Sequence, residues 1–413
     1  MKKNKSIYFS VFLLFISFSQ MVFGQEDLNR YLEIAAENNP ELQVKFNEYK
    51  AALEVIPQAK ALPDPQIAFA YFISPVETRM GPQEFKISAS QFFPWFGTLG
   101  AKEDAAIAFA KSKYEVFDET KSILFKDVKA DYYNLYFNQK SIGIILENIE
   151  LLKSIQKMAT IKVEAGTVSM VDEYRVQMEI NELENQLANL KDKQWALETS
   201  FRNLLNAEDE LTIHLPDHLW RTDLPLTKQA ALDSIQSKNH QLLQLEFKQT
   251  ALAYKKEAAR KEGMPDFKIG LDYIFIGEGE NNLSGKDAIV FPTVGITIPL
   301  YRKKYKAMVQ EVVYLESANE SAKQSKSNKL ETLFENTWKD YQDAERRIGL
   351  NERQLDLARK SLKLLESEYA TANSNFEEIL RMERKVLKYN LELEKAIADK
   401  QASIAFINYL MGK

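Results

Sequence analysis

Hydrophobic residues follow two different periods along this chain. In four short segments apolar and polar residues alternate one by one, and in four much longer segments apolar residues recur at steps of three and four. A period of two is typical of a strand with one apolar face, and steps of three and four are typical of helices that pack side by side. The pattern predicts strands at 65–73, 84–93, 267–276 and 289–299, and long helices at 98–163, 170–206, 302–372 and 376–411.

The four predicted strands share one arrangement of side chains. In the first, Ile67, Phe69 and Tyr71 alternate with Gln66 and Ala68. Alternation over about ten residues is typical of membrane β-strands, which turn apolar side chains to lipid, but a half-buried sheet of a soluble protein alternates in the same way. Polar segments at 74–83 and 277–288 join the strands into two expected hairpins. The aromatic residues that fit a belt at a membrane interface are Phe69, Tyr71, Phe92, Phe93, Trp95 and Phe96.

The long helices are predicted from the scarcity of helix-breaking residues. Between Thr98 and Lys162 the sequence has no proline, and its glycines are Gly100 and Gly143. At about 1.5 Å per residue, such a helix is on the order of 100 Å long. Narrow apolar seams favour antiparallel helical hairpins. The seam residues are Ile142, Ile145, Ile149, Leu152, Ala159 and Val163; Val176, Ile180, Leu183, Leu187, Leu190, Leu197, Phe201 and Leu204; Ile348, Leu355, Ala358, Leu362, Leu365 and Tyr369; and Ile379, Met382, Val386, Tyr389 and Leu393.

The chain also repeats itself at a period near 200 residues. The same order of helix, strand, strand, long helix and long helix is predicted twice, which indicates two copies of one large unit, at 25–225 and 226–413. The matching residues are Asn39 and Asn239; Pro63-Asp64 and Pro265-Asp266; Phe93-Pro94-Trp95-Phe96 and Ile298-Pro299-Leu300-Tyr301; and Asp172 with Arg175 and Glu378 with Arg381.

The N-terminus has the features of a signal peptide. Residues 1–5 are basic, residues 7–18 are apolar, and Gly24 offers a cleavage point before Gln25. The apolar run is too short to span a bilayer, and no later stretch reaches the roughly 20 apolar residues of a membrane helix. We therefore expect an exported chain that meets a membrane through its strands, if at all. Four strands are too few to close a barrel alone, so several copies would have to share one.

Composition excludes several classes of function. Charged residues make up 27% of the chain, are well mixed and give a net charge of -5, which does not suit a nucleic-acid-binding protein. The absence of cysteine excludes disulfides and thiolate metal sites. His214 and His218 lie with Asp217 in a linker where Pro216 argues against a helical metal site, and His240 has no evident partner. No catalytic, cofactor or metal site is expected.

The sequence resembles the TolC family of outer-membrane efflux proteins over nearly the whole mature chain. The residues that carry the resemblance are Asn39-Pro40-Glu41-Leu42, Leu62-Pro63-Asp64-Pro65, Ile298-Pro299-Leu300-Tyr301 and the turn Glu164-Ala165-Gly166-Thr167-Val168-Ser169-Met170-Val171-Asp172. At the second turn, 372–376, the chain departs from this pattern because asparagine stands where the first turn has glycine.

This resemblance implies an α+β membrane protein. Each protomer of a homotrimer would contribute four β-strands to a 12-stranded barrel in the outer membrane of a Gram-negative bacterium. Long antiparallel α-helical coiled-coil hairpins would form a periplasmic tunnel, and short helices near 27–60 and 226–262, with the linker 206–226, would form an equatorial layer. The implied partners are outer-membrane lipid, a periplasmic adaptor (membrane fusion protein) and an inner-membrane pump, in an efflux or type I secretion system.

Candidate functional residues lie at the two helical turns. In a trimer, their carboxylates would form acidic rings at the periplasmic aperture, which favour cations. The alternative is that Asp172 and Glu378 merely interact with the positive ends of the returning helices. Arg175 and Arg381 stand three residues on, where each can pair with the carboxylate of its own helix. The aperture candidates are Glu164, Gly166, Asp172, Glu173, Arg175, Glu377, Glu378 and Arg381.

Three charged residues, Lys86, Lys268 and Asp272, fall on the polar side of the predicted strands. They are expected to face the lumen of the barrel and to set its polarity, or else simply to be solvated. The preferred function is a passive trimeric conduit without enzymatic activity. The alternative is a periplasmic coiled-coil adaptor or structural protein, which needs no lipid-facing aromatic strands; a secreted hydrolase has no candidate site. The exported substrate is left open.

Overall fold

The computed structural model describes residues 25–207, 211–279, 285–371 and 376–413. The predicted signal peptide and most of the second helical turn lie outside these residues. The chain divides into two compact units. The hairpin unit comprises Met1–Val44, Asp118–Asn239 and Asn328–Lys413, and the sheet unit comprises Lys45–Phe117 and His240–Ser327. Each unit takes segments from both proposed copies, so the copies are not separate compact bodies.

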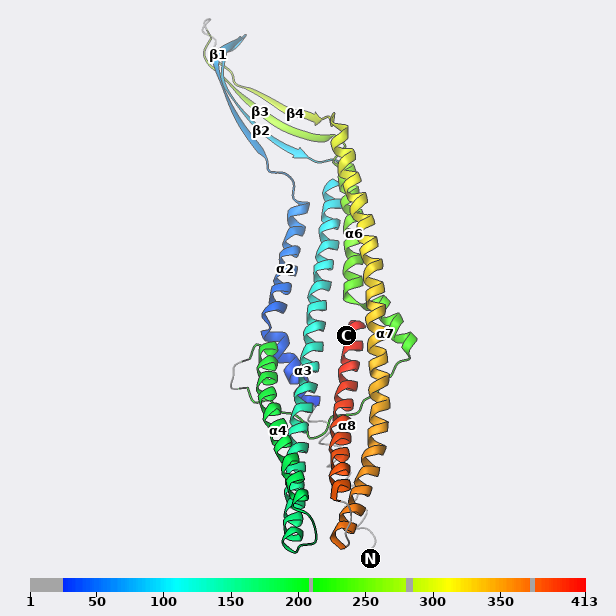
Figure 1. Cartoon of the computed structure of the whole chain (residues 1–413). Coiled ribbons are helices and arrows are strands. Elements are labelled where there is room, and N and C mark those ends of the chain that lie inside the picture. The colour runs from blue at the N-terminus through cyan, green and yellow to red at the C-terminus, as the bar shows by residue number, and fades with distance from the viewer. Residues whose placement is uncertain (1–24, 208–210, 280–284, 372–375) are drawn as a thin grey trace, which may run out of the picture. The chain divides into compact units, whose positions relative to one another are not determined.

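The sheet unit contains a single antiparallel sheet of four strands among the described residues. Its strands lie side by side in chain order (Figure 1). They are β1 (Gln66–Thr78), β2 (Gly81–Phe93), β3 (Asp266–Ile276) and β4 (Ala288–Thr297). In this order β1 and β4 are the two edges, and the two predicted hairpins are joined through β2 and β3.

The first hairpin is longer than the sequence predicts. Pairing continues through Val76 with Gln83 and Thr78 with Gly81, so most of the polar segment 74–83 is strand and the turn is confined to residues 79–80. Polar composition suggested a loop there, but backbone pairing does not need apolar side chains once the register is set. Gly81 has φ +132°, and a Cβ there would lie 2.0 Å from the carbonyl oxygen of Gly277. Only glycine fits this close approach.

Cross-strand register gathers the apolar residues on one face of the sheet. Tyr71, Phe85 and Phe275 form one row, and Phe69 joins Ile87 and Tyr273 in the next. The Phe85 and Phe275 rings stack with centroids 4.7 Å apart. These residues are not covered by the chain: Phe69 is 66% exposed and Ile73 is 94% exposed. The aromatic face is therefore an outer surface of the protomer.

Helices of the sheet unit flank the strands in sequence and are linked by ion pairs and amide contacts. They are part of α2 (Pro40–Lys60), the start of α3 (Thr98–Glu164), α6 (His240–Lys261) and the start of α7 (Arg302–Thr371). Lys256 of α6 pairs with Glu316 of α7 at 2.6 Å, and the Asn319 amide donates to the Leu245 carbonyl at 2.9 Å.

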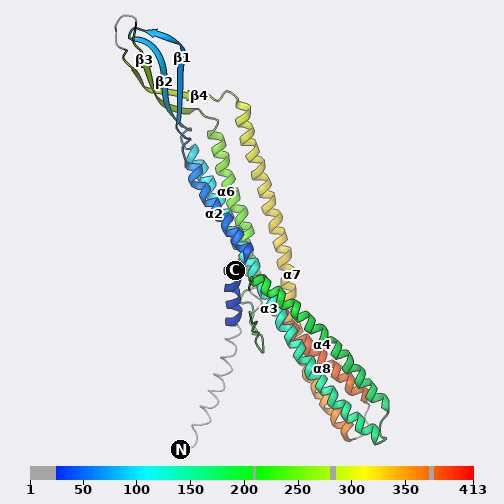
Figure 2. The ribbon, with the colours of Figure 1, turned by 90° about the vertical axis from the view of Figure 1, so that its left-hand side faces the viewer.

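The hairpin unit is a bundle of long helices with a continuous apolar core. The remainder of α3 returns through α4 (Met170–Leu205), and α7 returns through α8 (Phe376–Leu410), with the helices side by side (Figure 1 and Figure 2). A short helix, α5 (Lys228–Lys238), belongs to the same unit. Residues of the predicted seams fill the core, including Ile145, Ile149, Leu152, Ala159, Val176, Ile180, Leu183, Leu362, Tyr369 and Ile379. Among the described residues, no helix has the length and apolar content needed to cross a membrane.

One seam position differs from the prediction. Leu204 is half-buried, whereas Leu205 beside it is fully buried. After Phe201 the seam advances by four residues rather than three, and both steps occur in such packing. Sequence spacing alone does not choose between them at the last turn of a helix.

Asn39 and Asn239 hold corresponding helix ends within the hairpin unit. The Asn39 side-chain amide donates to the Leu204 carbonyl at 3.2 Å, and that of Asn239 donates to the Leu410 carbonyl at 2.9 Å. Each carbonyl lies in the last turn of a returning helix, where it has no partner within the helix. The Asn39 side chain also accepts from the Leu42 amide at 3.1 Å, which caps the start of α2.

Candidate functional site

The turn between α3 and α4 is a tight, capped connection that carries the first group of predicted residues. Gly166 has φ +69°, the left-handed conformation that glycine adopts without strain. The Thr167 amide donates to the Lys162 carbonyl at 3.0 Å, and the Ser169 hydroxyl accepts from the Val171 amide at 3.2 Å. The turn thus provides hydrogen-bond partners for backbone groups at the end of α3 and at the start of α4.

Carboxylates surround this turn as the sequence predicts. Glu164 is exposed at the end of α3, and Asp172 and Glu173 stand in the first turn of α4. That position also favours them through the positive end of the helix, so both interpretations of the acidic residues fit the geometry.

Arg175 lies between carboxylates of two different hairpins. Its guanidinium is 3.4 Å from Asp172 on its own helix and 3.6 Å from Glu377 at the start of α8. A second pair, Arg384 of α8 with Glu179 of α4 at 2.8 Å, joins the same two helices. The sequence suggested the Arg175–Asp172 pair because residues three apart share a helix face. The contacts between hairpins depend on the packing of α4 against α8, so no short-range pattern in the sequence predicts them.

Two aromatic residues, Tyr369 and Phe376, flank the second helical turn. The Tyr369 and Phe376 rings lie with centroids 5.1 Å apart, and the Lys162 ammonium lies 4.1 Å above the Tyr369 ring and donates to its carbonyl. Arg381 pairs with Glu378 on its own helix, whereas Glu377 is exposed. Sequence reasoning selected acidic residues and missed Lys162, whose contacts join α3 to α7.

On the sheet, the charged candidates lie on the face opposite the aromatic rows. Asp272 is 3.2 Å from Lys86 and accepts hydrogen bonds from Ser88 at 2.5 Å and Thr293 at 3.1 Å. Lys268 stands two positions beyond Gly270 on this face, with its ammonium 5.2 Å from the Phe92 ring. Lys86, Ser88, Asp272 and Thr293 therefore form one connected network on this face, whereas Lys268 lies against the Phe92 ring.

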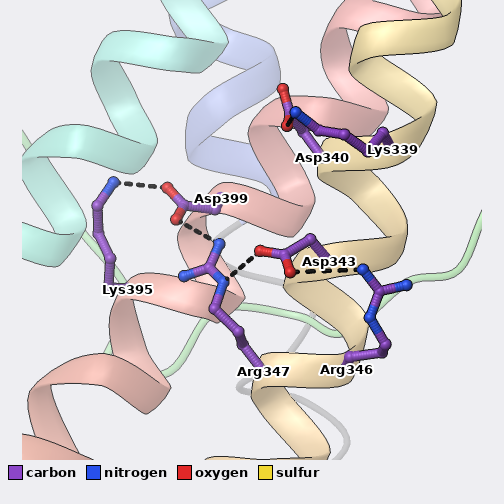
Figure 3. A network of polar contacts seen from close by, with 7 residues as sticks. All are labelled: Lys339, Asp340, Asp343, Arg346, Arg347, Lys395 and Asp399. Atoms are coloured by element: carbon purple, nitrogen blue, oxygen red, sulfur yellow. Dashed lines mark hydrogen bonds and ion pairs between the residues drawn. The ribbon is translucent and has the colours of Figure 1, made fainter.

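A further charged network joins α7 to α8 (Figure 3). Arg347 donates to Asp343 at 2.8 Å and to Asp399 at 3.0 Å, and Lys395 donates to Asp399 at 2.5 Å. The network borders a groove of about 500 Å³. Its charges are mutually neutralised, so it is a structural connection between the two helices.

The linker after the first copy is fastened to the same two helices. Lys400 of α8, which is 7% exposed, pairs with Asp223 of the linker and lies 3.5 Å from Glu345 of α7. Arg221 pairs with Glu352 of α7, and the Tyr341 hydroxyl accepts from the Leu224 amide at 3.4 Å.

The three histidines occupy different surroundings. His214 and His218 are exposed in the linker, and the described residues contain no group of metal-binding side chains. His240 does have a partner that the sequence did not reveal: its Nδ1 lies 2.8 Å from Glu115.

Comparison with known proteins identifies the fold and a partial match to one family model. Residues 31–207 match the family model of outer membrane efflux proteins. No curated protein matches the chain. Among solved structures, the outer-membrane channel OprN is 17% identical, with a TM-score of 0.76 over 94% of this chain and 90% of that one. VceC of Vibrio cholerae is 14% identical, with a TM-score of 0.74 over 95% of this chain and 98% of that one. The CmeC outer-membrane channel of Campylobacter jejuni is 14% identical, with a TM-score of 0.73 over 94% and 86%.

Proposed function

We propose that this chain is an outer membrane efflux protein and the outer-membrane subunit of a tripartite efflux or type I secretion system. The match of residues 31–207 to the family model and the TolC-like fold shared with solved channels support this proposal. Three copies form one passive conduit. Each contributes its sheet to a shared barrel in the outer membrane and its helical hairpins to a tunnel in the periplasm. A periplasmic adaptor connects this conduit to an inner-membrane pump.

The observation that carries the proposal is the two-sided sheet with open edges. Its aromatic face, including Phe69, Tyr71 and Phe275, is exposed on the protomer, and its other face carries the Lys86–Asp272 pair. A water-soluble sheet of this kind would bury one face against the chain. An apolar outer face and a polar inner face are the arrangement of a membrane barrel around an aqueous lumen.

Closure of the barrel requires neighbouring copies. The sheet ends at β1 and β4, whose outer edges have no strand partner among the described residues. Unsatisfied backbone groups are very costly in lipid, so these edges must pair. Three copies with four strands each supply twelve strands, which suffices for a closed cylinder with an open lumen. A periplasmic adaptor, the alternative function, has no need of such a sheet.

Two neighbouring positions on β1 test which face meets lipid. Phe69 lies in the aromatic rows, whereas Ala68 pairs with Ser88 beside Asp272. Lysine on the lipid face costs about 2–4 kcal/mol at the middle of the bilayer, but lysine in the lumen is solvated. Phe69→Lys is expected to lower the yield of heat-resistant trimer in the outer membrane several-fold, and Ala68→Lys is expected to leave it nearly unchanged.

Phe69→Ala separates the loss of the ring from the gain of charge. It should retain most of the trimer, because alanine is tolerated in lipid. Equal tolerance of lysine at both positions in membrane fractions would contradict the proposed orientation of the sheet.

We further propose that the aperture candidates set access at the periplasmic end. The Arg175–Glu377 contact joins the two hairpins of a chain, so it restrains their separation. Around it stand Glu164, Asp172, Glu173, Glu377 and Glu378, five carboxylates against Arg175 and Arg381. A ring of this excess negative charge favours cations in a narrow pore.

Single-channel recording tests this second proposal. Replacing both Asp172 and Glu378 with alanine should lower the preference for cations over anions. Arg175→Ala should raise conductance, because it releases Glu377 and adds to the negative charge. Lys153→Ala is the control, since Lys153 is a half-exposed cation of α3 that pairs with Glu150 of its own helix. An unaltered cation preference in the double variant would count against the acidic filter.

A further inference from the structure

One carboxylic acid is buried in the apolar core of the hairpin unit. Glu383 of α8 is 2% exposed, and one of its oxygens accepts from the side-chain amide of Asn148 of α3. Its other oxygen, Oε2, has no hydrogen-bond partner among the described residues. A charged carboxylate in such surroundings is strongly unfavourable unless it is paired.

Among the described residues, no cation compensates the charge of Glu383. From α7, the negative charge of Glu366 acts on it, and from α3 the Asn148 amide is its hydrogen-bond donor. The next residue on α8, Arg384, is turned to Glu179 of α4 and forms a 2.8 Å ion pair there. The apolar core of the same unit includes Ile145, Ile149 and Leu152 of α3, Leu362 of α7 and Ile379 and Leu380 of α8.

Burial raises the pKa of Glu383 to about 7, Asn148 opposes this rise, and the charge of Glu366 adds to it. Below this value the carboxyl is neutral and fits the apolar core. The neutral acid can donate through one oxygen and accept from Asn148 through the other. Above it, the site contains a charge that only one amide stabilises.

We propose that Glu383 and Asn148 form a proton-binding site between the two helical hairpins, and that loss of the proton loosens their packing. Because Asn148 belongs to the first hairpin and Glu383 to the second, the penalty of the buried charge falls on the contact between them. The chain is thereby most tightly packed in acid and loosens toward neutral and alkaline pH. The proton-binding site itself does not depend on the proposed function. An effect of this loosening on conduction through the channel rests on the proposed function.

The sign of the pH dependence follows from the raised pKa. The folded state holds a proton that the unfolded chain loses near the ordinary glutamate value, so rising pH destabilises the fold between that value and about 7. The destabilisation is complete above pH 7. Replacement by glutamine, which stays neutral and keeps the acceptor for Asn148, removes this dependence.

Hydrogen exchange of the purified full-length protein from pH 5 to pH 8 tests the site without reference to conduction. After correction for the intrinsic pH dependence of exchange, amides near Asn148 and Glu383 should lose protection at least tenfold more in the original protein than in Glu383→Gln. Glu392→Gln, an exposed position on α8, is the control and should behave like the original protein. Parallel profiles for the original protein and Glu383→Gln would overturn the proposal.

Asn148→Leu provides a second, independent measurement. It removes the amide that favours the charged form, so the midpoint of the protection change should move to higher pH. An unchanged midpoint would show that Asn148 is not part of the site.

If the exchange profiles follow these expectations but conductance in planar bilayers is the same at pH 5 and pH 8, the site stands and its control of the channel fails. If the protein forms no channels at all, the proposed function fails while the exchange result still decides the site.

Discussion

Asn39 and Asn239 perform the same task at the ends of two different helices. Each side-chain amide donates to a carbonyl in the last turn of a returning helix, at Leu204 and at Leu410. In the sequence, the two residues match through the similarity of their neighbours. Their equivalent contacts support the proposal that the chain contains two copies of one unit.

Asn39→Ala and Asn239→Ala should therefore destabilise the protein by similar mechanisms. Each leaves a carbonyl without its partner, which costs about 1–3 kcal/mol when the group is buried. Asn239 is fully buried and should show the larger loss. Reversible denaturant unfolding of the purified protein measures both, and Asn203→Ala, at an exposed helical position, should change stability by less than about 0.5 kcal/mol.

The residues also show why some contacts can be predicted and others cannot. The Arg175–Asp172 pair depends only on helix geometry, and the sequence predicted it. The Arg175–Glu377 contact and the Asn148–Glu383 contact depend on how separate helices pack, which sequence periodicity does not specify to within a residue. Glu383 in particular looks like any polar residue beside a seam.

At the scale of elements, long helices and strand positions were predictable because their signals are repeated many times. The helix from Thr98 ends at Glu164, one residue from its predicted end. The first hairpin was less predictable, because polar residues such as Glu77 and Gln83 continue its strands where a loop was expected. Gly166 indicated the turn between α3 and α4. Its positive φ explains why glycine occupies this position.

Two glycines with the same open surroundings predict opposite effects of alanine. A Cβ at either Gly143 or Gly166 would meet no atom within 4 Å, but only Gly166 has a positive φ. Gly143→Ala should stabilise α3 by up to about 1 kcal/mol, through helix propensity. Gly166→Ala should destabilise the turn by about 1–2 kcal/mol, through backbone strain. Thermal unfolding of the two variants side by side measures the difference, and a shift in the same direction for both would contradict this account.

At the scale of the whole molecule, the linker between the proposed copies is fixed to the second one. Lys400 of α8 is nearly buried and pairs with Asp223, and the Figure 3 network holds α8 to α7 beside it. The Lys400–Asp223 pair joins residues 177 positions apart, and the Arg347–Asp399 pair joins residues 52 positions apart, so no local pattern indicates either contact.

Lys400→Met should release the linker while preserving the apolar stem that packs around it. Asp223 would lose its partner, and limited proteolysis within 211–226 should become at least several-fold faster. Lys395→Met is the control, because Lys395 is more exposed and its ion pair, with Asp399, lies within α8 and does not involve the linker. Equal protection of the linker in both variants would show that the Lys400 pair does not hold it.

The two open edges of the sheet have a consequence for the life of the chain before it assembles. On the proposed function, a newly exported copy presents the outer edges of β1 and β4, which have no strand partner in the described part of the chain, together with exposed aromatic rings such as Phe69. Such surfaces aggregate readily in water. On the proposed function, each copy would need protection from water until its sheet enters the bilayer, and overproduction should yield insoluble material in proportion to how far synthesis outruns assembly.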